Sequence, residues 1–513
     1  MSMSAREWLA KVAATDRPPV LTKADLPEKR ILRELERSGA LIRLRGEIVV
    51  IKRPSDSRDE VLRRLYWPIV GALLTRYAPA VVERDSAVRV LVGDETPPRV
   101  LRIRNGRNAS NFEVALGGDL TVVVTAGAVA ESSIRTLPVG DATVSVDESA
   151  RILGGLELRF VRDNLDTISV WLRSLVLSRA SIEAAYRENP RPVVYRRIAH
   201  LAEDIGNERL AEALADVVRT NQDVRIGRGQ TGVGTELIVP PLARATPTTR
   251  RPWLDRLNLQ IDTFREQIAE AARHQPLARP TTSLPDLILQ AKEAKTHDVY
   301  HSTSIEGYRI RYEDVSVLLG GTPEGAMSEA EVRDRMAVLG YSLAFDNLLE
   351  RIEREGARLV PTTTMVLDLY VDLFSPSVEA GIVDPELLRG WRAEPVFIRD
   401  SRYVPPAAER VGDMMNLMVE RLADLDEPIV EAILGHLMLV SIHPFPDGNG
   451  RVGRFLMNAI LLANGWPWLT IHEGDRGGYF DSLKKAQLDM DARDFGVFVL
   501  ERLGGASEGS GGV

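Results

Sequence analysis

The sequence predicts a multidomain protein whose C-terminal half is mainly all-α, preceded by a small basic module and a mixed α+β domain. A chain of 513 residues with 44% hydrophobic content is too long for a single core. From Trp253 to about Leu503 the apolar residues recur at a spacing of 3.6, which is typical of amphipathic helices. The first 53 residues hold twelve Lys and Arg against seven Asp and Glu, whereas the whole chain has a net charge of −8.

Charge, cysteine content and hydropathy restrict the class of protein. A pI near 5.6 does not suggest a protein that coats nucleic acid. The absence of cysteine excludes disulfides and thiolate metal sites, and it suits a reducing compartment. The N-terminus lacks the apolar core of a signal peptide, and no apolar run approaches the ~20 residues that span a bilayer. We therefore expect a soluble, cytoplasmic protein with no membrane partner.

Residues 1–55 show the pattern of a winged helix-turn-helix. Thr22 is a candidate N-cap, and Pro27 and Gly39 mark the start and end of a helix. The stretch ALIRLRGEIVVIKRP then alternates apolar and charged residues around Gly46, as a short hairpin does. In this order of elements one helix enters the major groove of DNA and the wing contacts phosphates, so DNA is the expected partner. A charged module that binds only protein is the alternative. The stretch LRELERSGALIRLRGEIVVI also resembles the winged-helix head of abortive-infection antitoxin repressors.

Residues 60–220 predict an accessory α+β domain without a catalytic cluster. LYWPIVGALLTRYAPAVVERDSAVRVL and YRRIAHLAEDIGNERLAEALADVV favour helices, whereas LTVVVTAGAVAESSIRTL and GLELRFV favour strands. Residues 221–250 hold four closely spaced glycines followed by Pro, Thr and Arg, which predicts a linker rather than a nucleotide-binding loop. A helical domain is expected at 251–503, interrupted by a β-prone candidate hairpin at 394–404, and residues 504–513 predict a flexible tail.

The stretch 443–454, HPFPDGNGRVGR, concentrates the chemistry of the chain. It follows a helix that starts at Pro428 and ends near Ile442, and it opens the next helix. A glycine-rich turn at a helix N-terminus directs backbone N–H groups towards an anion, and two arginines three residues apart can hold phosphate oxygens. A carboxylate in the turn suits a hard cation, and a histidine suits a general base near neutral pH. The combination predicts nucleotidyl or phosphoryl transfer. The stretch is not a Walker A loop, because no Lys-Ser/Thr pair follows its second glycine.

This stretch resembles the signature of the Fic family, H-x-F-x-D/E-G-N-G-R-x-x-R, at every position, and the resemblance extends over about 250–503. It implies an all-α bundle and transfer of AMP from ATP to a Tyr, Ser or Thr hydroxyl of a protein, with Mg²⁺ and release of pyrophosphate. It further implies that His443 is the base, that Asp447 holds Mg²⁺, and that Phe445 anchors the loop in the core.

The other positions of the signature carry over as nucleotide contacts. The resemblance implies that the turn Gly448-Asn449-Gly450 binds the α- and β-phosphates. It also implies that Arg451 contacts the phosphates and that Arg454 contacts the γ-phosphate, which places both arginines in the catalytic set. Gly450 stands where the kinase-like branch of the family has lysine, so the resemblance implies an AMP transferase.

Three further segments resemble parts of the family. HSTSIEGYRI, within 296–312, resembles its inhibitory helix S/T-x-x-x-E-G/N through Ser302, Glu306 and Gly307, which implies that Glu306 pairs with Arg454 and fills the space of the γ-phosphate. The stretch 394–404 corresponds to a flap that holds a target segment as an added strand. DRGGYFDSLKKA resembles the segment that closes the adenine pocket, which makes Tyr479 a stacking residue, with an ordinary packing tyrosine as the alternative.

The sequence thus favours a self-inhibited protein adenylyltransferase with a DNA-binding head. The alternative is an ATP-sensing transcriptional regulator, or an antitoxin-like DNA-binding protein, in which the Fic domain acts as a gate. The target protein, the modified residue, the DNA site, the removal of AMP and the oligomeric state, a homodimer included, stay open.

Overall fold

The computed structural model describes residues 5–13, 19–22, 25–45, 48–107, 111–130, 134–221, 251–320, 328–356 and 359–508. Backbone contacts divide the chain into two compact units. The first comprises Met1–Arg256 with the short segment Phe397–Val404, and the second comprises Leu257–Val396 and Pro405–Val513. Of the predicted linker 221–250, residues 222–250 lie outside the described residues. Within those residues, no helix combines the length and the apolar character needed to cross a membrane.

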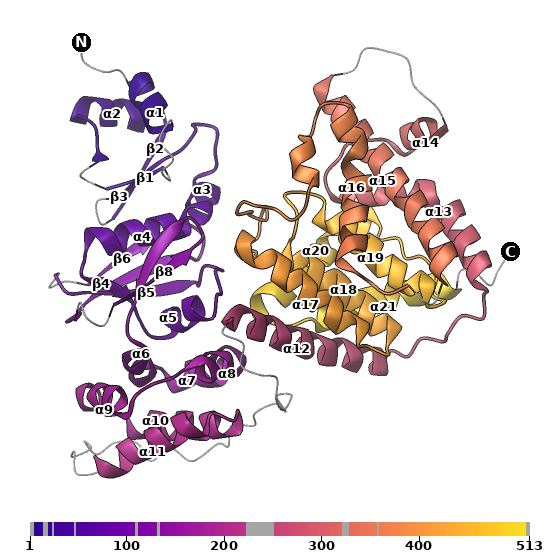
Figure 1. Ribbon diagram of the computed structural model, residues 1–513. Coiled ribbons are helices and arrows are strands. Elements are labelled where there is room, and N and C mark those ends of the chain that lie inside the picture. The colour runs from indigo at the N-terminus through magenta and orange to yellow at the C-terminus, as the bar shows by residue number, and fades with distance from the viewer. Residues whose placement is uncertain are drawn as a thin grey trace. The chain divides into compact units, whose positions relative to one another are not determined.

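The first unit begins with a small module of two helices and a three-stranded antiparallel sheet (Figure 1). The helix α2 buries Ile31, Leu32 and Leu35 in a core that also contains Trp8. It begins at Lys29 rather than at Pro27, and it ends before Gly39, whose φ of 71° turns the chain into the next strand. The elements are α1 (Ala5–Ala13), β1 (Val20–Leu21), α2 (Lys29–Arg37), β2 (Leu41–Leu44) and β3 (Ile48–Ile51), in the sheet order β1-β3-β2.

The hairpin predicted after Gly39 is confirmed as the pair β2 and β3, in which Leu41 faces Ile51 and Leu44 faces Ile48. Gly46, expected at its turn, lies outside the described residues. Thr22 contacts Asp25, since its backbone oxygen accepts from the N–H of Asp25 (2.9 Å) and its hydroxyl donates to the Asp25 carboxylate (2.8 Å). Residues 23–24, which directly follow this predicted N-cap, lie outside the described residues.

The rest of the first unit is a mixed six-stranded sheet with helices, as the α+β expectation requires. The strand order is β6-β7-β5-β4-β9-β8, with parallel pairs β5–β7 and β4–β9 and antiparallel neighbours elsewhere. The strands are β4 (Ala80–Val82), β5 (Val100–Asn105), β6 (Phe112–Ala115), β7 (Thr121–Ala126), β8 (Arg135–Val139) and β9 (Ala142–Val146). The helices before and among them are α3 (Arg58–Arg64), α4 (Tyr66–Arg76) and α5 (Arg84–Leu91).

Between the sheet and residue 221 the described elements are all helices. The predicted helix pair is confirmed as α10 (Pro192–Asp204) and α11 (Glu208–Thr220), preceded by α8 (Leu165–Ser174) and α9 (Arg179–Glu188). The strand predicted for GLELRFV is wrong, because this stretch spans the end of α6 (Ser149–Gly155) and most of α7 (Leu158–Asp163). A short run of alternating apolar residues forms a strand only where a neighbouring strand can pair with it, and here the chain has left the sheet at Val146.

The second unit is helical, with α18 and α19 in its interior (Figure 1). Every residue from Val430 to Ile442 of α18 is buried, and α19 is buried over nearly its whole length. A helix that is apolar on all sides has to lie in the core, surrounded by other helices. The α-helices are α12 (Pro252–His274), α13 (Leu284–Ile305), α14 (Tyr312–Gly320), α15 (Glu329–Glu355), α16 (Thr363–Glu379), α17 (Val411–Ala423), α18 (Pro428–Ile442), α19 (Asn449–Ala463), α20 (Arg476–Asp489) and α21 (Arg493–Glu508).

Two local predictions for this half require correction. The stretch 394–404 contains no strand and forms an extended loop with a turn at Asp400, whose φ is 56°. Proline at 395, 405 and 406 removes backbone donors that a hairpin ladder needs. The predicted flexible tail is helical up to Glu508, because Val499, Leu500 and Leu503 are buried and anchor α21. Residues 509–513 lie outside the described residues.

Candidate functional site

The loop 443–448 joins α18 to α19 and begins with a residue in an unusual backbone conformation. His443 caps α18 in the left-handed region (φ 54°, ψ 60°), and its N–H donates to Leu439 O at 2.8 Å. Such a φ is uncommon for a residue with a side chain and is kept only when the surroundings enforce it. Here Arg392 does so, since its Nε donates to His443 O (2.8 Å) and its N–H donates to Pro444 O (2.9 Å). Sequence reasoning missed Arg392, which lies 51 residues before the loop in no motif.

The imidazole of His443 has a defined tautomer. Its Nδ1 lies 3.2 Å from Val440 O, and because a carbonyl oxygen only accepts, Nδ1 carries the proton and Nε2 has a free lone pair. Burial lowers the pKa of His443 to about 4, outweighing the raising effect of the Val440 carbonyl. The ring is therefore neutral near pH 7 and can accept a proton at Nε2.

The middle of the loop is held by the side chain of Asn449. Its Oδ1 accepts from the N–H of Phe445 (3.0 Å), and its Nδ2 donates to Phe445 O (2.8 Å). Phe445 is fully buried and stacks on Tyr370 with ring centroids 3.9 Å apart, which confirms its anchoring role. The Asn449 side chain is thus engaged within the loop, so the atom of Asn449 that remains to meet a phosphate is its backbone N–H.

Gly448 and Asp447 shape the point where α19 begins. Gly448 has a φ of 82°, and a Cβ at this position would lie 2.7 Å from Phe374, so only glycine fits. Asp447 accepts from the N–H of Gly448 at 2.7 Å through Oδ1, and its side chain is 68% exposed. Its second oxygen lies 3.5 Å from Arg451 Nη2, and this exposed carboxylate is suited to a hard cation.

Arg451 is a buried cation with unused donors. It is 1% exposed, and its guanidinium lies 5.1 Å from the ring centroids of both Tyr308 and Phe374. Its Nε and Nη2 make no hydrogen bond to the described residues, and Nη2 has only the 3.5 Å ion-pair contact with Asp447. The residue lies in the first turn of α19, where the backbone N–H groups also lack intrahelical partners. Buried, unsatisfied donors of this kind favour an anion at this helix terminus.

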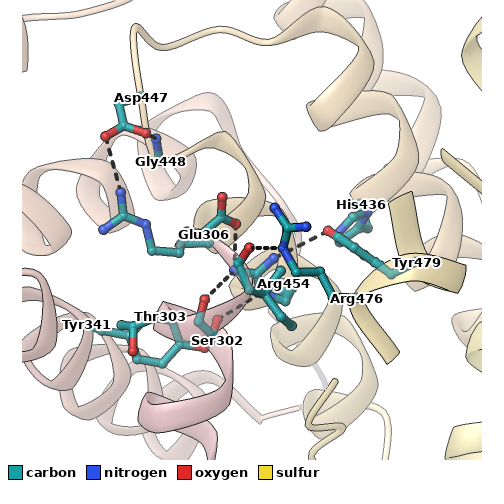
Figure 2. A network of polar contacts seen from close by, with 12 residues as sticks. Ser302, Thr303, Glu306, Tyr341, His436, Asp447, Gly448, Arg454, Arg476 and Tyr479 are labelled. Atoms are coloured by element: carbon teal, nitrogen blue, oxygen red, sulfur yellow. Dashed lines mark hydrogen bonds and ion pairs between the residues drawn. The ribbon is translucent and has the colours of Figure 1, made fainter. Parts of the chain in front are cut away.

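Arg454, one turn further along α19, donates three hydrogen bonds to residues of the C-terminal turn of α13 (Figure 2). Its Nε donates to Ser302 Oγ (2.7 Å), and its Nη2 donates to Ser302 O (3.0 Å) and to Glu306 Oε1 (2.8 Å). Burial by itself disfavours the charged guanidinium, but the carboxylate of Glu306 raises the pKa of Arg454 above its usual value. Glu306 and Arg454, which the resemblance implies to be a pair, are thus in contact although they lie 148 positions apart in the chain.

Gly307 ends the helix that carries these two partners of Arg454. It has a φ of 91°, and the N–H of Tyr308 reaches back to Thr303 O at 3.3 Å, as in a Schellman-type helix end. Glu306 is the last residue of this turn, which directs its side chain towards α19 (Figure 2). Glycine at this position thus allows the helix to stop where the carboxylate meets Arg454.

Gly450 lies directly against the carboxylate. A Cβ on Gly450 would collide with Glu306 Oε1 and would approach Arg454 Nη1 to 3.2 Å. The glycine that the resemblance links to AMP transfer therefore also makes room for Glu306. A long side chain at 450 is incompatible with this position of the carboxylate.

Tyr479 is a buried residue that contacts Arg454. It is 1% exposed, and its ring is enclosed by His436, Phe495 and Phe498. Its hydroxyl oxygen accepts from Arg454 Nη1 (3.3 Å) and lies 2.9 Å from His436 Nε2. These contacts fit the alternative of a packing residue that supports Arg454, and the stacking of a base on Tyr479 stays a prediction.

Two further polar residues hold α13 in place, and sequence reasoning missed both. Asp298 is buried and accepts from Tyr341 (2.9 Å) and Thr470 (2.8 Å), while burial raises its pKa. Arg476 donates to Ile305 O at 2.9 Å and so satisfies a carbonyl at the end of α13. The sequence does contain a sign of the buried position of Asp298, because helical spacing places this carboxylate on the same face of α13 as the buried residues Val299 and Ser302. No sequence pattern indicates the role of Arg476.

Comparison with known proteins gives a consistent result for this half of the chain. Residues 362–461 match the model of the Fic/DOC family. A protein adenylyltransferase Fic of Nematostella vectensis is 32% identical over 272 residues, which make up 51% of this chain and 59% of the relative. A protein of the same name from Aedes aegypti is 31% identical over 219 residues, or 41% of this chain and 40% of the relative. The chain thus spans about half the length of the curated relatives it matches.

A solved structure of Fic-1 from C. elegans is also similar to the chain. It is 19% identical, covers 68% of this chain and 96% of its own, and has a TM-score of 0.37. The match to the family model and the identity to the named relatives show that the C-terminal half of the chain contains a Fic domain.

Proposed function

We propose that this chain, whose C-terminal half contains a Fic domain, is a protein adenylyltransferase that transfers AMP from ATP to a Tyr, Ser or Thr hydroxyl of a target protein. The observation that carries the proposal is the buried guanidinium of Arg451, with donors that make no hydrogen bond, in the first turn of the helix that follows the loop begun by a neutral His443. An anion site next to a base is what nucleotidyl transfer to a hydroxyl requires.

In the proposed step the hydroxyl oxygen of the target attacks the α-phosphorus of ATP and forms a new O–P bond. The bond from that phosphorus to the oxygen bridging to the β-phosphate breaks, and pyrophosphate leaves with the bonding pair. The hydroxyl proton passes to Nε2 of His443, whose other nitrogen is held by Val440 O. The N–H groups of Gly450 and Arg451 and the Arg451 guanidinium stabilise the negative charge on the phosphates.

Asp447 is the residue that would hold Mg²⁺. Its exposed carboxylate at the start of α19 has the oxygen chemistry that this cation prefers, and it lies at the same turn as the anion site. When bound, Mg²⁺ neutralises charge on the phosphates and on the leaving pyrophosphate. The target segment is proposed to dock along the extended stretch 394–404 through backbone hydrogen bonds, as an added strand.

We also propose that Glu306 restrains this activity. Arg454 is the cation that would meet the γ-phosphate, and in the structure its donors are taken by Ser302 and Glu306. A carboxylate and a phosphate compete for the same planar guanidinium, so ATP cannot bind productively while the ion pair persists. Release of Glu306 from Arg454 would therefore be the activating event.

Incubation of the full chain with ATP labelled at the α- or the γ-phosphate and with a protein lysate tests the activity. The expected result is covalent label on protein from α-labelled ATP only, strong in Glu306→Gly and weak in the wild type. Label from γ-labelled ATP would indicate a kinase instead. No label from either in Glu306→Gly would overturn the proposal.

A second function is favoured by one observation in the N-terminal module. One side of α2 exposes Lys29, Arg30, Arg33 and Arg37, while the opposite side packs in the core. We propose that residues 1–55 form a winged helix-turn-helix that binds DNA through this basic face. We also propose that the protein is cytoplasmic. Binding of the full chain to duplex DNA should weaken steeply with added salt and should weaken further in Arg30→Ala/Arg33→Ala. Salt-independent binding, or none, would leave the protein-binding alternative.

A further inference from the structure

Three of the seven histidines of the chain meet at α13, and none of the three belongs to the loop 443–448. His297 and His301 are one helical turn apart on α13, and His472 comes from the segment before the short helix Glu473–Asp475. One nitrogen of each ring lies within 4.8 Å of a nitrogen of the other two. The ring centroids are 4.2, 5.1 and 4.6 Å apart.

The contact between the first two rings is close for groups that would repel if both were charged. Nε2 of His301 lies 3.0 Å from Nε2 of His297, so at most one of these nitrogens carries a proton. Neutral imidazoles with converging lone pairs are the form in which histidine binds metal ions.

The arrangement has the geometry of a three-histidine metal site. Two histidines at i and i+4 on one helix face, with a third ligand from another segment, are a common ligand set for Zn²⁺. Tetrahedral coordination with Zn–N bonds of about 2.0–2.1 Å places the nitrogens roughly 3.4 Å apart. Because these nitrogens all lie within 4.8 Å of one another, the widest pair has to close by at most roughly 1.4 Å, which rotation of the exposed His472 ring can supply.

We propose that His297, His301 and His472 bind a transition-metal ion of the Zn²⁺ type, with a fourth position open to water. This ligand set lies outside the signature loop and does not include Asp447. Nδ1 of His301 accepts from the N–H of Glu473 at 3.2 Å, so metal binding through Nε2 moves the ring proton to Nδ1 and costs this hydrogen bond. Three metal–nitrogen bonds outweigh one weak hydrogen bond.

The bound ion would connect α13 to the segment that leads into α20. His301 immediately precedes Ser302, and Glu306 lies just over one turn beyond it, so the site adjoins the part of α13 that holds Arg454. Thr470 already joins the same two segments through its hydrogen bond to Asp298. A metal crosslink makes displacement of the C-terminal turn of α13 less favourable. Given the proposed function, Zn²⁺ would therefore strengthen the restraint by Glu306.

Titration of the tag-free full chain, first treated with chelator, tests the site directly. Isothermal titration with ZnCl₂ should give one equivalent for the wild type, and Co²⁺ should give the visible absorption of a tetrahedral site. His472→Ala should bind at least tenfold more weakly; this residue is exposed, so its loss should not disturb the fold. His274→Ala, an exposed histidine on α12, should bind as the wild type does. No stoichiometric binding by the wild type, or equal binding by His472→Ala, would overturn the proposal.

Hydrogen exchange separates the regulatory consequence from the proposed enzyme activity. Zn²⁺ should slow exchange of the backbone amides at 302–308 in the wild type and not in His472→Ala. It should lower residual AMP transfer by the wild type at least threefold, with no such effect on His472→Ala. Slowed exchange without any change in measurable transfer would refute the link to Glu306. Absence of transfer even in Glu306→Gly would refute the proposed function, while the ZnCl₂ titration would still decide the metal site.

Discussion

Glu306 Oε1 lies 2.8 Å from Arg454 Nη2, and the two residues are 148 positions apart in the chain. The guanidinium is 3% exposed and the carboxylate side chain is 24% exposed, so the pair is largely shielded from water. Ser302 adds two hydrogen bonds to the same guanidinium. Arg454 is thus held by one helix turn of α13, and any ligand that needs this cation has to displace Glu306.

Substitution Glu306→Gly should raise AMP transfer by roughly 10- to 100-fold, the equivalent of one hydrogen bond to a charged group. The reason is that Arg454 becomes available to the γ-phosphate. The measurement is incorporation of labelled AMP, into the protein itself and into a lysate, at equal ATP concentration. Glu293→Gly, at an exposed position of the same helix, controls for the loss of helix propensity and should stay near the wild-type level.

The double variant Glu306→Gly/Arg454→Ala completes this test. It should return to the low activity of the wild type, since the freed arginine is the agent of activation. If the double variant keeps the activity of Glu306→Gly, Arg454 has no part in the reaction. If Glu306→Gly itself matches the wild type, the ion pair has only a structural role.

Substitution His443→Ala in the Glu306→Gly background should lower transfer by about 10²- to 10⁴-fold, the range for loss of a general base. ATP affinity, measured by isothermal titration, should change less than threefold, because Nε2 acts on the hydroxyl and not on the nucleotide. His274→Ala is the matched control at an exposed position. Transfer within threefold of the parent would contradict the assigned role.

The pH dependence follows from the environment of His443. Burial lowers its pKa to about 4, and only the neutral ring can accept the hydroxyl proton. In the Glu306→Gly background kcat/KM should therefore be flat from about pH 5.5 to 8 and should fall as the pH drops through about 4. Removal of Glu306, whose charge raises this pKa, shifts the fall slightly lower. Circular dichroism at each pH controls for unfolding, and a fall centred near 6.5 would show that the base is solvated.

Substitution Asp447→Ala should abolish Mg²⁺-dependent transfer in the Glu306→Gly background. The carboxylate is the exposed oxygen ligand at the start of α19, and without it the cation is held only by the phosphates. The measurement is the rate of AMP incorporation as a function of Mg²⁺ concentration. Asp489→Ala, exposed at the end of α20, should leave the curve unchanged. An unaltered curve for Asp447→Ala would place the metal elsewhere.

Substitution Asn449→Ala should destabilise the protein by about 1–3 kcal/mol without any nucleotide present. Both hydrogen bonds to the backbone of Phe445 are lost, and the buried N–H and carbonyl are left without partners. Urea denaturation measures the change in the free energy of unfolding. A full loss of transfer with unchanged stability would instead assign the amide to the phosphates.

Local patterns in the sequence determined the helices of the second unit and the chemistry of 443–454. The helix from Pro428 to Ile442 and the hairpin of β2 and β3 follow from spacing and turn residues within about fifteen positions. The same holds for the signature loop, because a turn followed at once by a helix N-terminus brings its groups together whatever surrounds it. Ser302 and Glu306 also share a face by helical spacing alone.

Only the tertiary structure decided what depends on partners far away in the chain. The stretch 394–404 has the composition of a strand but forms none, because a strand exists only with a paired neighbour. Tyr479 is enclosed by residues of α18 and α21, and burial of this kind has no local sequence signal. Arg392 supports a loop that begins 51 residues later, and His472 meets histidines of α13 that lie 171 (472 − 301) and 175 (472 − 297) residues before it. Only tertiary packing brings together residues so far apart in the chain.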